Sequence, residues 1–328
     1  MTPSSSVSTP STPPEGLCMQ ESTMNESGTH VDKHLVHTGK RLLLVDVDSK
    51  IPNLALMKCS AAYKSEGWET GFNITNPSLI IASIVFSKNN WKADAIRQMH
   101  PGVPLLVGGS GYQLDSKLPD RVEFVKPDYD LYPSEYSQGF TTRGCNRSCY
   151  FCVVPGKEGK LVHWQHPKDF HDDRFGTIYL MDNNWLMDKP WFLETSGWIM
   201  DKGLKVMEGG MDIRCIDASV AKRLSDLEIK QMHFAFDFLE LEPVIRSKVK
   251  LLKEYCGPPK HDPTFYIYVE SDAQFDSALR RCEILRELDV TPFIMWDQKS
   301  RKTKRIRRLI HWANRPALFW STEWEGYA

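Results

Sequence analysis

The sequence predicts an α/β protein in which a small Rossmann-like parallel sheet precedes a partial (β/α)6 barrel. Apolar strand-like segments alternate with helix-like segments along the chain. This alternation stops near residue 115 and restarts at Ser137, which indicates two separate sheets. A chain of 328 residues with 41% apolar residues is long enough to bury a core in each part.

Residues 1–37 are rich in Ser, Thr and Pro, and we expect this tail to be disordered because it has little apolar surface to bury. The start of the chain lacks the apolar stretch of a secretory signal, and no segment approaches the ~20 apolar residues of a membrane span. We therefore expect a cytoplasmic protein with no membrane partner. Its eight cysteines then indicate buried thiols and a metal site rather than disulfides.

The Rossmann-like part and its linker are expected over 38–135. A continuous apolar run such as LIIASIVFS, from Leu79, is typical of a strand that is covered on both faces. The predicted strands begin at Arg41, Leu79 and Pro104, with helices over 53–69 and 91–102 between them. The linker over 117–136 is expected to hold one short strand.

The barrel is expected over 136–298, and a C-terminal extension over 299–328. Six strands alternate with helices there, fewer than the eight of a complete β/α barrel. The predicted strands span 137–143, 176–184, 204–214, 231–239, 264–271 and 290–297. The predicted helices span 186–202, 217–229, 240–256 and 274–288.

Three cysteines, Cys145, Cys149 and Cys152, have the spacing C-x3-C-x2-C in the loop after the first barrel strand. A structural zinc site needs four ligands, and His163 or His166 would have to supply the fourth. A four-iron cluster is the alternative, because thiolates suit iron–sulfur clusters and three of them leave one iron open. The remaining cysteines lack this spacing: Cys59 and Cys282 are predicted to be core residues, Cys215 and Cys256 lie near element ends, and Cys18 lies in the tail.

This spacing, with Phe151 just before the third cysteine and a β/α barrel around it, resembles the radical S-adenosylmethionine (SAM) superfamily over about 137–297. The resemblance implies a [4Fe-4S] cluster on Cys145, Cys149 and Cys152, with SAM bound to the open iron. It also implies that an electron from a reductant such as flavodoxin or ferredoxin cleaves SAM to a 5′-deoxyadenosyl radical, which abstracts hydrogen from a substrate. Phe151 would pack near the adenine.

Polar residues follow the predicted barrel strands, at the end where β/α barrels carry their chemistry. We expect the following to bind the cofactor: Asp182, Asn183, Asn184, Asp212, Arg214, Asp237 and Glu270. The superfamily commonly has Gly-Gly-Glu where this chain has Asp182-Asn183-Asn184, and one of these three would then accept from the SAM amino group. Arg214 would hold the SAM carboxylate, because a guanidinium binds carboxylates bidentately.

The N-terminal part resembles the cobalamin-binding domain that precedes many radical SAM barrels. The usual D-x-H-x-x-G motif is absent, and DVDSKIPN stands at 46–53 in its place. We therefore expect no bound cobalamin. The GGSG turn at 108–111 is interpreted as a tight turn or a phosphate site.

Seven basic residues lie between Lys299 and Arg308, in a helix whose apolar face holds Ile306, Leu309, Ile310 and Ala313 and which Pro316 is expected to end. The basic face is a solvated helix face or a grip for nucleic-acid phosphates. A net charge of −1 confines any such partner to a local patch.

The sequence thus predicts a radical SAM enzyme of unidentified substrate, with a preference for a nucleic-acid base or nucleotide that rests only on the basic helix. One alternative is a non-catalytic zinc or iron–sulfur module that binds nucleic acid. Another is a radical SAM enzyme that modifies peptides or transfers methyl groups.

Overall fold

A computed structural model describes residues 39–257, 263–297 and 300–327. The tail predicted over 1–37 lies outside the described residues. Residues 39–328 make one compact unit. Within the described ranges, no helix is both long enough and apolar enough to cross a membrane.

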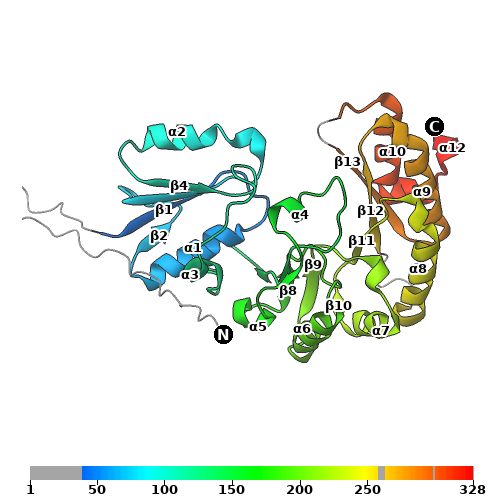
Figure 1. The fold of residues 1–328 in the computed structure, drawn as a ribbon, viewed down its shortest axis with the longest axis horizontal. Coiled ribbons are helices and arrows are strands. Elements are labelled where there is room, and N and C mark those ends of the chain that lie inside the picture. The colour runs from blue at the N-terminus through cyan, green and yellow to red at the C-terminus, as the bar shows by residue number, and fades with distance from the viewer. Residues whose placement is uncertain (1–38, 258–262, 298–299, 328) are drawn as a thin grey trace, which may run out of the picture. The chain divides into compact units, whose positions relative to one another are not determined.

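The N-terminal sheet is fully parallel and has the strand order β2-β1-β3-β4 (Figure 1). Helices α1 (Leu54–Ser65) and α2 (Lys92–Met99) lie on its two faces, each over a separate apolar core. The strands are β1 (Arg41–Asp46), β2 (Glu69–Gly71), β3 (Leu79–Ser83) and β4 (Leu105–Gly108). The strands β1, β3 and β4 were predicted from the sequence. Strand β2 was not, because its three partly polar residues at the sheet edge leave no apolar pattern.

The strand predicted in the linker is wrong, because this segment forms the helical turn α3 (Asp120–Glu123) instead. Pro119 stands just before the turn, in extended conformation. The only buried residue of α3, Val122, packs into the core under α1. A single apolar residue in four gives neither a strand period nor a helix period, so pattern analysis has no signal here.

The barrel part contains two parallel sheets, with the orders β10-β9-β8-β5 and β11-β12-β13 (Figure 1). Its strands are β5 (Ser137–Gly139), β8 (Thr177–Leu180), β9 (Lys205–Glu208), β10 (Glu228–Ile229), β11 (His233–Ala235), β12 (Thr264–Val269) and β13 (Thr291–Trp296). The six predicted strands are confirmed, most of them shorter than expected, and β10 is an additional two-residue strand. The Met211 N–H donates to the His233 carbonyl at 3.0 Å, which joins the two sheets.

Four helices cover the outer face of these strands over one large core. They are α6 (Lys189–Asp201), α7 (Ala218–Asp226), α8 (Glu242–Cys256) and α9 (Phe275–Glu287). The Asp188 and Asp217 carboxylates cap α6 and α7 by accepting backbone N–H groups of the first turn. Cys282 on α9 belongs to this core and Cys59 on α1 to an N-terminal core, as predicted.

The first predicted barrel strand divides after Gly139. A Cβ at Gly139 would lie 2.6 Å from the ring of Phe170, so the strand end has no room for a side chain. The chain then leaves the barrel sheet and forms β6 (Thr142–Arg143), which pairs antiparallel with β7 (Val162–His163). Between these strands lies the cysteine loop (144–161) with α4 (Val154–Lys157), and α5 (Pro167–Phe170) follows β7.

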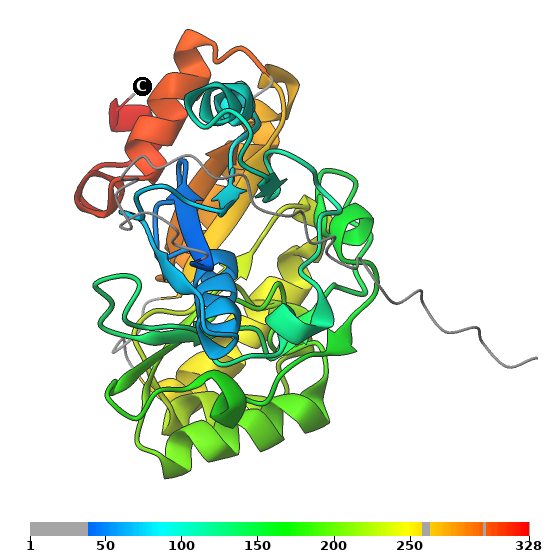
Figure 2. The same ribbon diagram turned by 90° about the vertical axis from the view of Figure 1, so that its left-hand side faces the viewer.

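The C-terminal extension folds against α9 and β13 (Figure 2, orange to red). Helix α10 (Lys304–Ala313) buries Ile306, Leu309 and Ala313 as predicted, with Ile310 partly buried. Pro316 does not end this helix. Asn314 caps α10, and Pro316 is the first residue of α11 (Pro316–Ser321), which is followed by α12 (Trp324–Tyr327).

Candidate metal centre

The three cysteines lie on one loop whose base is closed by tight backbone packing. Gly144 enters the loop with a φ of +77°, and a Cβ there would overlap the Lys160 carbonyl oxygen, so only glycine fits. The Cys145 N–H then donates to the Gly159 carbonyl at 3.2 Å. The loop therefore starts and ends at one fixed point beside β6.

Glu158, at the far end of the loop, holds this base together. Its carboxylate accepts from the Gly144 N–H at 3.0 Å, from Arg143 Nη2 at 2.9 Å and from Asn183 Nδ2 at 2.7 Å. Burial opposes ionisation, but the Gly144 bond, the Arg143 charge and the Asn183 bond outweigh it and lower the pKa of Glu158. Glu158 was missed by the sequence analysis, because it belongs to no strand end and its partners are distant in the chain.

Asp182, which follows β8, holds the other side of the loop base. Its buried carboxylate accepts four hydrogen bonds, from the backbone N–H and the hydroxyl of both Thr141 and Thr142, at 2.6–2.9 Å. Burial raises the pKa of Asp182, although these bonds favour the charged form. Oδ1 accepts three of these bonds and Oδ2 accepts one, and the expected contact of Asp182 with the SAM amino group stays a prediction.

The two residues after Asp182 are also bonded within the protein. Asn183 donates to Glu158, and Asn184 Oδ1 accepts from the Asp212 N–H at 3.1 Å. Asn184 and Asp182 are buried, whereas Asn183 is partly exposed. The three residues together join the end of β8 to the cysteine loop and to the segment after β9.

Asp212 binds two arginines at once. Arg147, which lies between the first two cysteines, places Nε 2.6 Å from Asp212 Oδ2. Arg214, in the short helix η2 (Ile213–Cys215), places Nε 2.8 Å from Asp212 Oδ1. Burial opposes the charge of Asp212, but its hydrogen bonds with Arg214 and Arg147 lower its pKa. Cys215 also interacts with Arg147, so this thiol, which has no ligand spacing in the sequence, lies at the edge of the same site.

Electrostatic coupling identifies the groups around Cys149. Burial, the Asp237 carboxylate and the other two thiols raise the pKa of the Cys149 thiol, while Arg214 opposes them. The Cys152 N–H donates to the Cys149 carbonyl at 3.0 Å. Arg214 and Asp237, which follow two other predicted strands, are therefore near enough to the cysteine loop to change the ionisation of Cys149.

The residues present fit an iron–sulfur cluster better than a zinc ion. His163 stacks on Trp191 at a centroid distance of 4.4 Å and places Nε2 3.1 Å from Asp188, while His166 accepts from the Lys168 N–H to cap α5. Across 39–257, 263–297 and 300–327, no three His, Cys, Asp or Glu side chains are gathered closely enough to bind one metal ion. This absence includes the three loop cysteines, so the fit to a four-iron cluster rests on their spacing in the sequence, because three thiolates leave one of its irons open.

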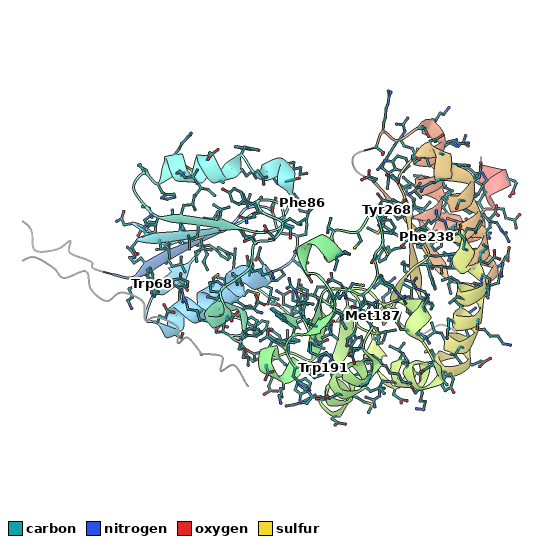
Figure 3. All side chains as sticks on the ribbon, in the orientation of Figure 1. Trp68, Phe86, Met187, Trp191, Phe238 and Tyr268 are labelled. Atoms are coloured by element: carbon teal, nitrogen blue, oxygen red, sulfur yellow. The ribbon has the colours of Figure 1, made fainter. Side chains whose placement is uncertain are left out.

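Aromatic side chains pack the loop against β12. The Phe151 ring stacks on Tyr268 at 4.2 Å and lies 6.2 Å from Phe238; Figure 3 labels these last two residues. The Tyr150 hydroxyl donates to Glu270 Oε2 at 3.2 Å. Phe151 is therefore held within the site by other rings, and its predicted contact with adenine stays a prediction.

A buried arginine on α9 fixes the strand ends behind the site. Arg281 Nη1 donates to the carbonyls of Phe236 and Asp237 at 3.0 and 2.8 Å. The Asp237 carboxylate accepts from the Tyr268 N–H at 2.8 Å, and burial raises its pKa. Arg281 was not predicted as a site residue, because it lies among the buried apolar residues of α9.

A buried glutamate bonded to a histidine lies where the two sheets of the barrel part meet. Glu208, the last residue of β9, accepts from the backbone N–H and Nδ1 of His233 at 2.7 and 2.9 Å. Its other oxygen is buried and has no protein partner among the described residues. Burial raises the pKa of Glu208, although His233 opposes this. His233 stacks on Tyr266 at a centroid distance of 5.5 Å, so this pair adjoins the aromatic residues of β12.

In the N-terminal sheet, the segment that replaces the cobalamin motif is used internally. Asp48 accepts from the backbone N–H groups of Val85 and Phe86 at 2.7 and 3.1 Å and from Asn89 Nδ2 at 2.7 Å. Burial opposes its charge, but these bonds lower the pKa of Asp48. Asp48 thus fastens the loop after β3 to the loop after β1.

The GGSG turn packs just as closely. Gly109 has a φ of +98°, and a Cβ there would overlap the Ile84 carbonyl oxygen, while one at Gly111 would lie 2.6 Å from the Phe86 backbone. The Gly111 N–H donates to the Ile84 carbonyl at 2.9 Å. Close backbone packing therefore accounts for the glycines, as the tight-turn interpretation predicted.

The fold combines a parallel N-terminal sheet with a partial barrel that carries the C-x3-C-x2-C loop. It is similar to solved structures of the radical SAM methyltransferase TsrM from Kitasatospora setae. One has cobalamin and a [4Fe-4S] cluster bound; its TM-score is 0.58 at 11% identity, over 79% of this chain and 75% of that chain. Another has tryptophan substrate and the SAM analogue aza-SAM bound. Its TM-score is 0.58 at 11% identity, over 78% of this chain and 73% of that chain.

In sequence, part of the chain is similar to ribosomal protein uS12 methylthiotransferase RimO. Identity is 30% over 88 residues to the protein of Psychrobacter arcticus, covering 22% of this chain and 17% of that one. It is 35% over 83 residues to the protein of Cellvibrio japonicus, covering 22% and 18%. The similarity thus spans less than a fifth of these relatives' length. No family model matches the chain.

Proposed function

We propose that the chain is a radical SAM enzyme, in which Cys145, Cys149 and Cys152 hold a [4Fe-4S] cluster and SAM binds its open iron. The observation that carries this proposal is the C-x3-C-x2-C loop after the first barrel strand, with Arg214 held by Asp212 and its charge acting on the Cys149 thiol. When bound and reduced by one electron, the cluster would supply that electron to the carbon–sulfur bond of SAM, giving methionine and a 5′-deoxyadenosyl radical that abstracts one hydrogen atom.

The chain's own groups would position SAM rather than react with it. Among the described residues, the Arg214 side chain bonds to Asp212 through Nε alone, so its terminal nitrogens are the groups that would bind the SAM carboxylate. Arg147 and Asp212 would keep this guanidinium in place relative to the cysteine loop. The rings of Phe151, Phe238 and Tyr268 would exclude water from the same edge of the loop.

The test is reductive SAM cleavage by the full chain, loaded anaerobically with iron and sulfide and given dithionite. We expect methionine and 5′-deoxyadenosine in equal amounts, and neither product from Cys149→Ala. Cys256→Ser, at the end of α8 and outside the loop, is the matched control and should cleave SAM like the unaltered chain. A colourless, zinc-loaded protein without SAM cleavage would overturn the proposal and support the binding module instead.

We further propose that the N-terminal sheet retains no cobalamin. Residues 46–53 contain no histidine to ligate cobalt, Asp48 is bonded to the loop after β3, and Gly109 and Gly111 are packed against backbone. The test is gel filtration after incubation with hydroxocobalamin, with absorbance as the readout. Co-eluting cobalamin would contradict the proposal and favour methyl transfer, the reaction class of the methyltransferase TsrM.

A further inference from the structure

We propose that the cationic side chains at the start of α10 form a docking surface for single-stranded nucleic acid at the mouth of the candidate metal centre. The proposal rests on the proposed function and deepens it, because it assigns the substrate class. The basic surface consists of Arg301, Lys302, Lys304, Arg305, Arg307 and Arg308. Lys299, which also belongs to this run in the sequence, lies outside the described residues.

The fold presents these cations on a rigid support. The opposite face of α10 is buried in the large core through Ile306, Leu309 and Trp312. The hydroxyl of Thr303 caps the helix by accepting from the Ile306 N–H at 3.3 Å. The helix therefore cannot rotate its basic face inward, and the charges stay in solvent at fixed spacing.

Most of this charge is not neutralised within the protein. Arg305 forms an ion pair with Asp272 at 3.0 Å. In the part of the chain that the structure describes, Arg301, Lys302, Lys304 and Arg307 have no acidic partner within ion-pair distance, and Arg307 donates only to the Lys302 carbonyl at 2.9 Å. Such a cluster on a chain of net charge −1 is a local site for an anionic polymer.

Side chains just after β12 contact both the cysteine loop and the basic surface. Tyr150, between the second and third cysteines, donates to Glu270 at the end of β12. Two residues later, Asp272 accepts from the Thr303 hydroxyl and pairs with Arg305. The basic surface thus begins at the strand end where the loop packs, so a polymer bound to it would pass the mouth of the site.

Exposed apolar side chains on the loop and on β13 favour nucleic acid with unpaired bases. Tyr150 is 62% exposed, and Phe293 and Met295, on one face of β13, are 41% and 49% exposed. Unpaired bases stack on rings such as those of Tyr150 and Phe293, whereas a duplex keeps its bases inside and a lipid surface or polyglutamate offers no planar rings. A strand bound by its phosphates would therefore place a base near the cysteine loop.

The test measures binding of fluorescein-labelled single-stranded RNA and DNA, about 12 nucleotides long, to the cluster-loaded full chain. Fluorescence anisotropy is recorded over a range of salt concentrations. Duplex DNA, polyglutamate and vesicles with anionic lipid serve as comparison ligands. The variant is Lys304→Glu with Arg307→Glu. Its matched control is Lys230→Glu with Lys250→Glu, which makes the same charge change at exposed positions after β10 and on α8.

We expect single strands to bind more tightly than all three comparison ligands. The Lys304→Glu/Arg307→Glu variant should weaken this binding about tenfold or more, and flatten the log–log salt slope by about 1.4 for two lost phosphate contacts. The control pair should bind like the unaltered chain. Equal binding by the variant, or preferred binding of duplex, polyglutamate or vesicles, would overturn the proposal.

Cleavage of SAM without substrate, measured on the same preparations, separates this proposal from the proposed function. An unaltered rate in the Lys304→Glu/Arg307→Glu variant shows that its site and fold are intact, so its binding result then decides the proposal. SAM cleavage by a chain that binds no single strand would overturn the docking surface alone. If single strands bind through Lys304 and Arg307 but the chain does not cleave SAM, the docking surface is supported and the proposed enzyme activity is overturned.

Discussion

Arg147 of the cysteine loop and Asp212 after β9 form an ion pair in which Nε and Oδ2 are 2.6 Å apart. The same carboxylate holds Arg214 at 2.8 Å, so one acid fixes two guanidinium groups, and the charge of Arg214 acts on the Cys149 thiol. Because Arg147 lies within the C-x3-C-x2-C motif, this contact links the position of the thiols to that of the expected carboxylate-binding group. We therefore predict that Asp212 is a positioning residue for SAM.

Asp212→Asn should weaken SAM binding about tenfold while the iron content of the protein stays unchanged. The substitution removes the charge that orients Arg214, and both arginines are partly exposed, so the loss of folding stability should stay near 1 kcal/mol. Anaerobic titration calorimetry with SAM provides the measurement. Asp217→Asn, which removes the charge from the Lys189 pair at the start of α7, is the control. Unchanged affinity for SAM would refute the positioning role.

Asp182→Asn should lower the free energy of unfolding by about 2–4 kcal/mol. An amide offers one oxygen where the carboxylate offers two, and its N–H groups meet the donors of Thr141 and Thr142 in a buried site. Urea unfolding of the chain measures the loss. Asp276→Asn, at an exposed position on α9, should change stability by less than about 0.5 kcal/mol. A loss no larger than that of Asp276→Asn would show that the hydrogen bonds of Asp182 with Thr141 and Thr142 do not stabilise the fold.

Protonation of Glu158 should contribute to the loss of folding stability in acid. Its pKa is lower in the folded chain than the ~4.3 of an unfolded glutamate, so its contribution is complete above about pH 4.3 and is lost as pH falls through the folded value. Glu158→Gln should therefore be less stable than the unaltered chain at pH 7 and lose less stability on acidification. Unfolding free energies across this pH range provide the check, with exposed Glu254→Gln as control. If the unfolding free energy changes equally with pH in Glu158→Gln and in the unaltered chain, Glu158 does not contribute to the loss of stability in acid.

Gly109→Ala should destabilise the N-terminal sheet more than Gly102→Ala does. Both glycines have positive φ, so alanine is strained by about 1–2 kcal/mol at either position. A Cβ at Gly102 meets open space, whereas one at Gly109 overlaps the Ile84 carbonyl oxygen, which adds a steric cost. The difference between their melting temperatures isolates that cost. Equal melting temperatures would show that the turn has room for a side chain.

The fold was largely predictable from the sequence, because apolar periodicity marks every long strand and helix. Exceptions such as β2, β10 and α3 are too short to show a period, and their positions depend on neighbouring strands or on one buried side chain such as Val122.

The site was predictable only in part. The cysteine spacing marked the loop, and the strand-end rule brought Arg214 and Asp237 to it. The roles of Asp182 and Glu158 depend on partners 41 and 25 residues away, such as Thr141 and Asn183, which no local pattern shows. Glu208 and Arg281 escaped prediction for the same reason, since buried polar groups on apolar elements are recognised only from their partners.

Electron paramagnetic resonance of the dithionite-reduced, iron-loaded chain would test whether the three thiols leave one iron of a cluster open for SAM. We predict a signal from a reduced four-iron cluster that shifts when SAM is added and that is absent from Cys149→Ala. A cluster signal that SAM leaves unchanged, or a protein that holds zinc and gives no signal, would contradict the account.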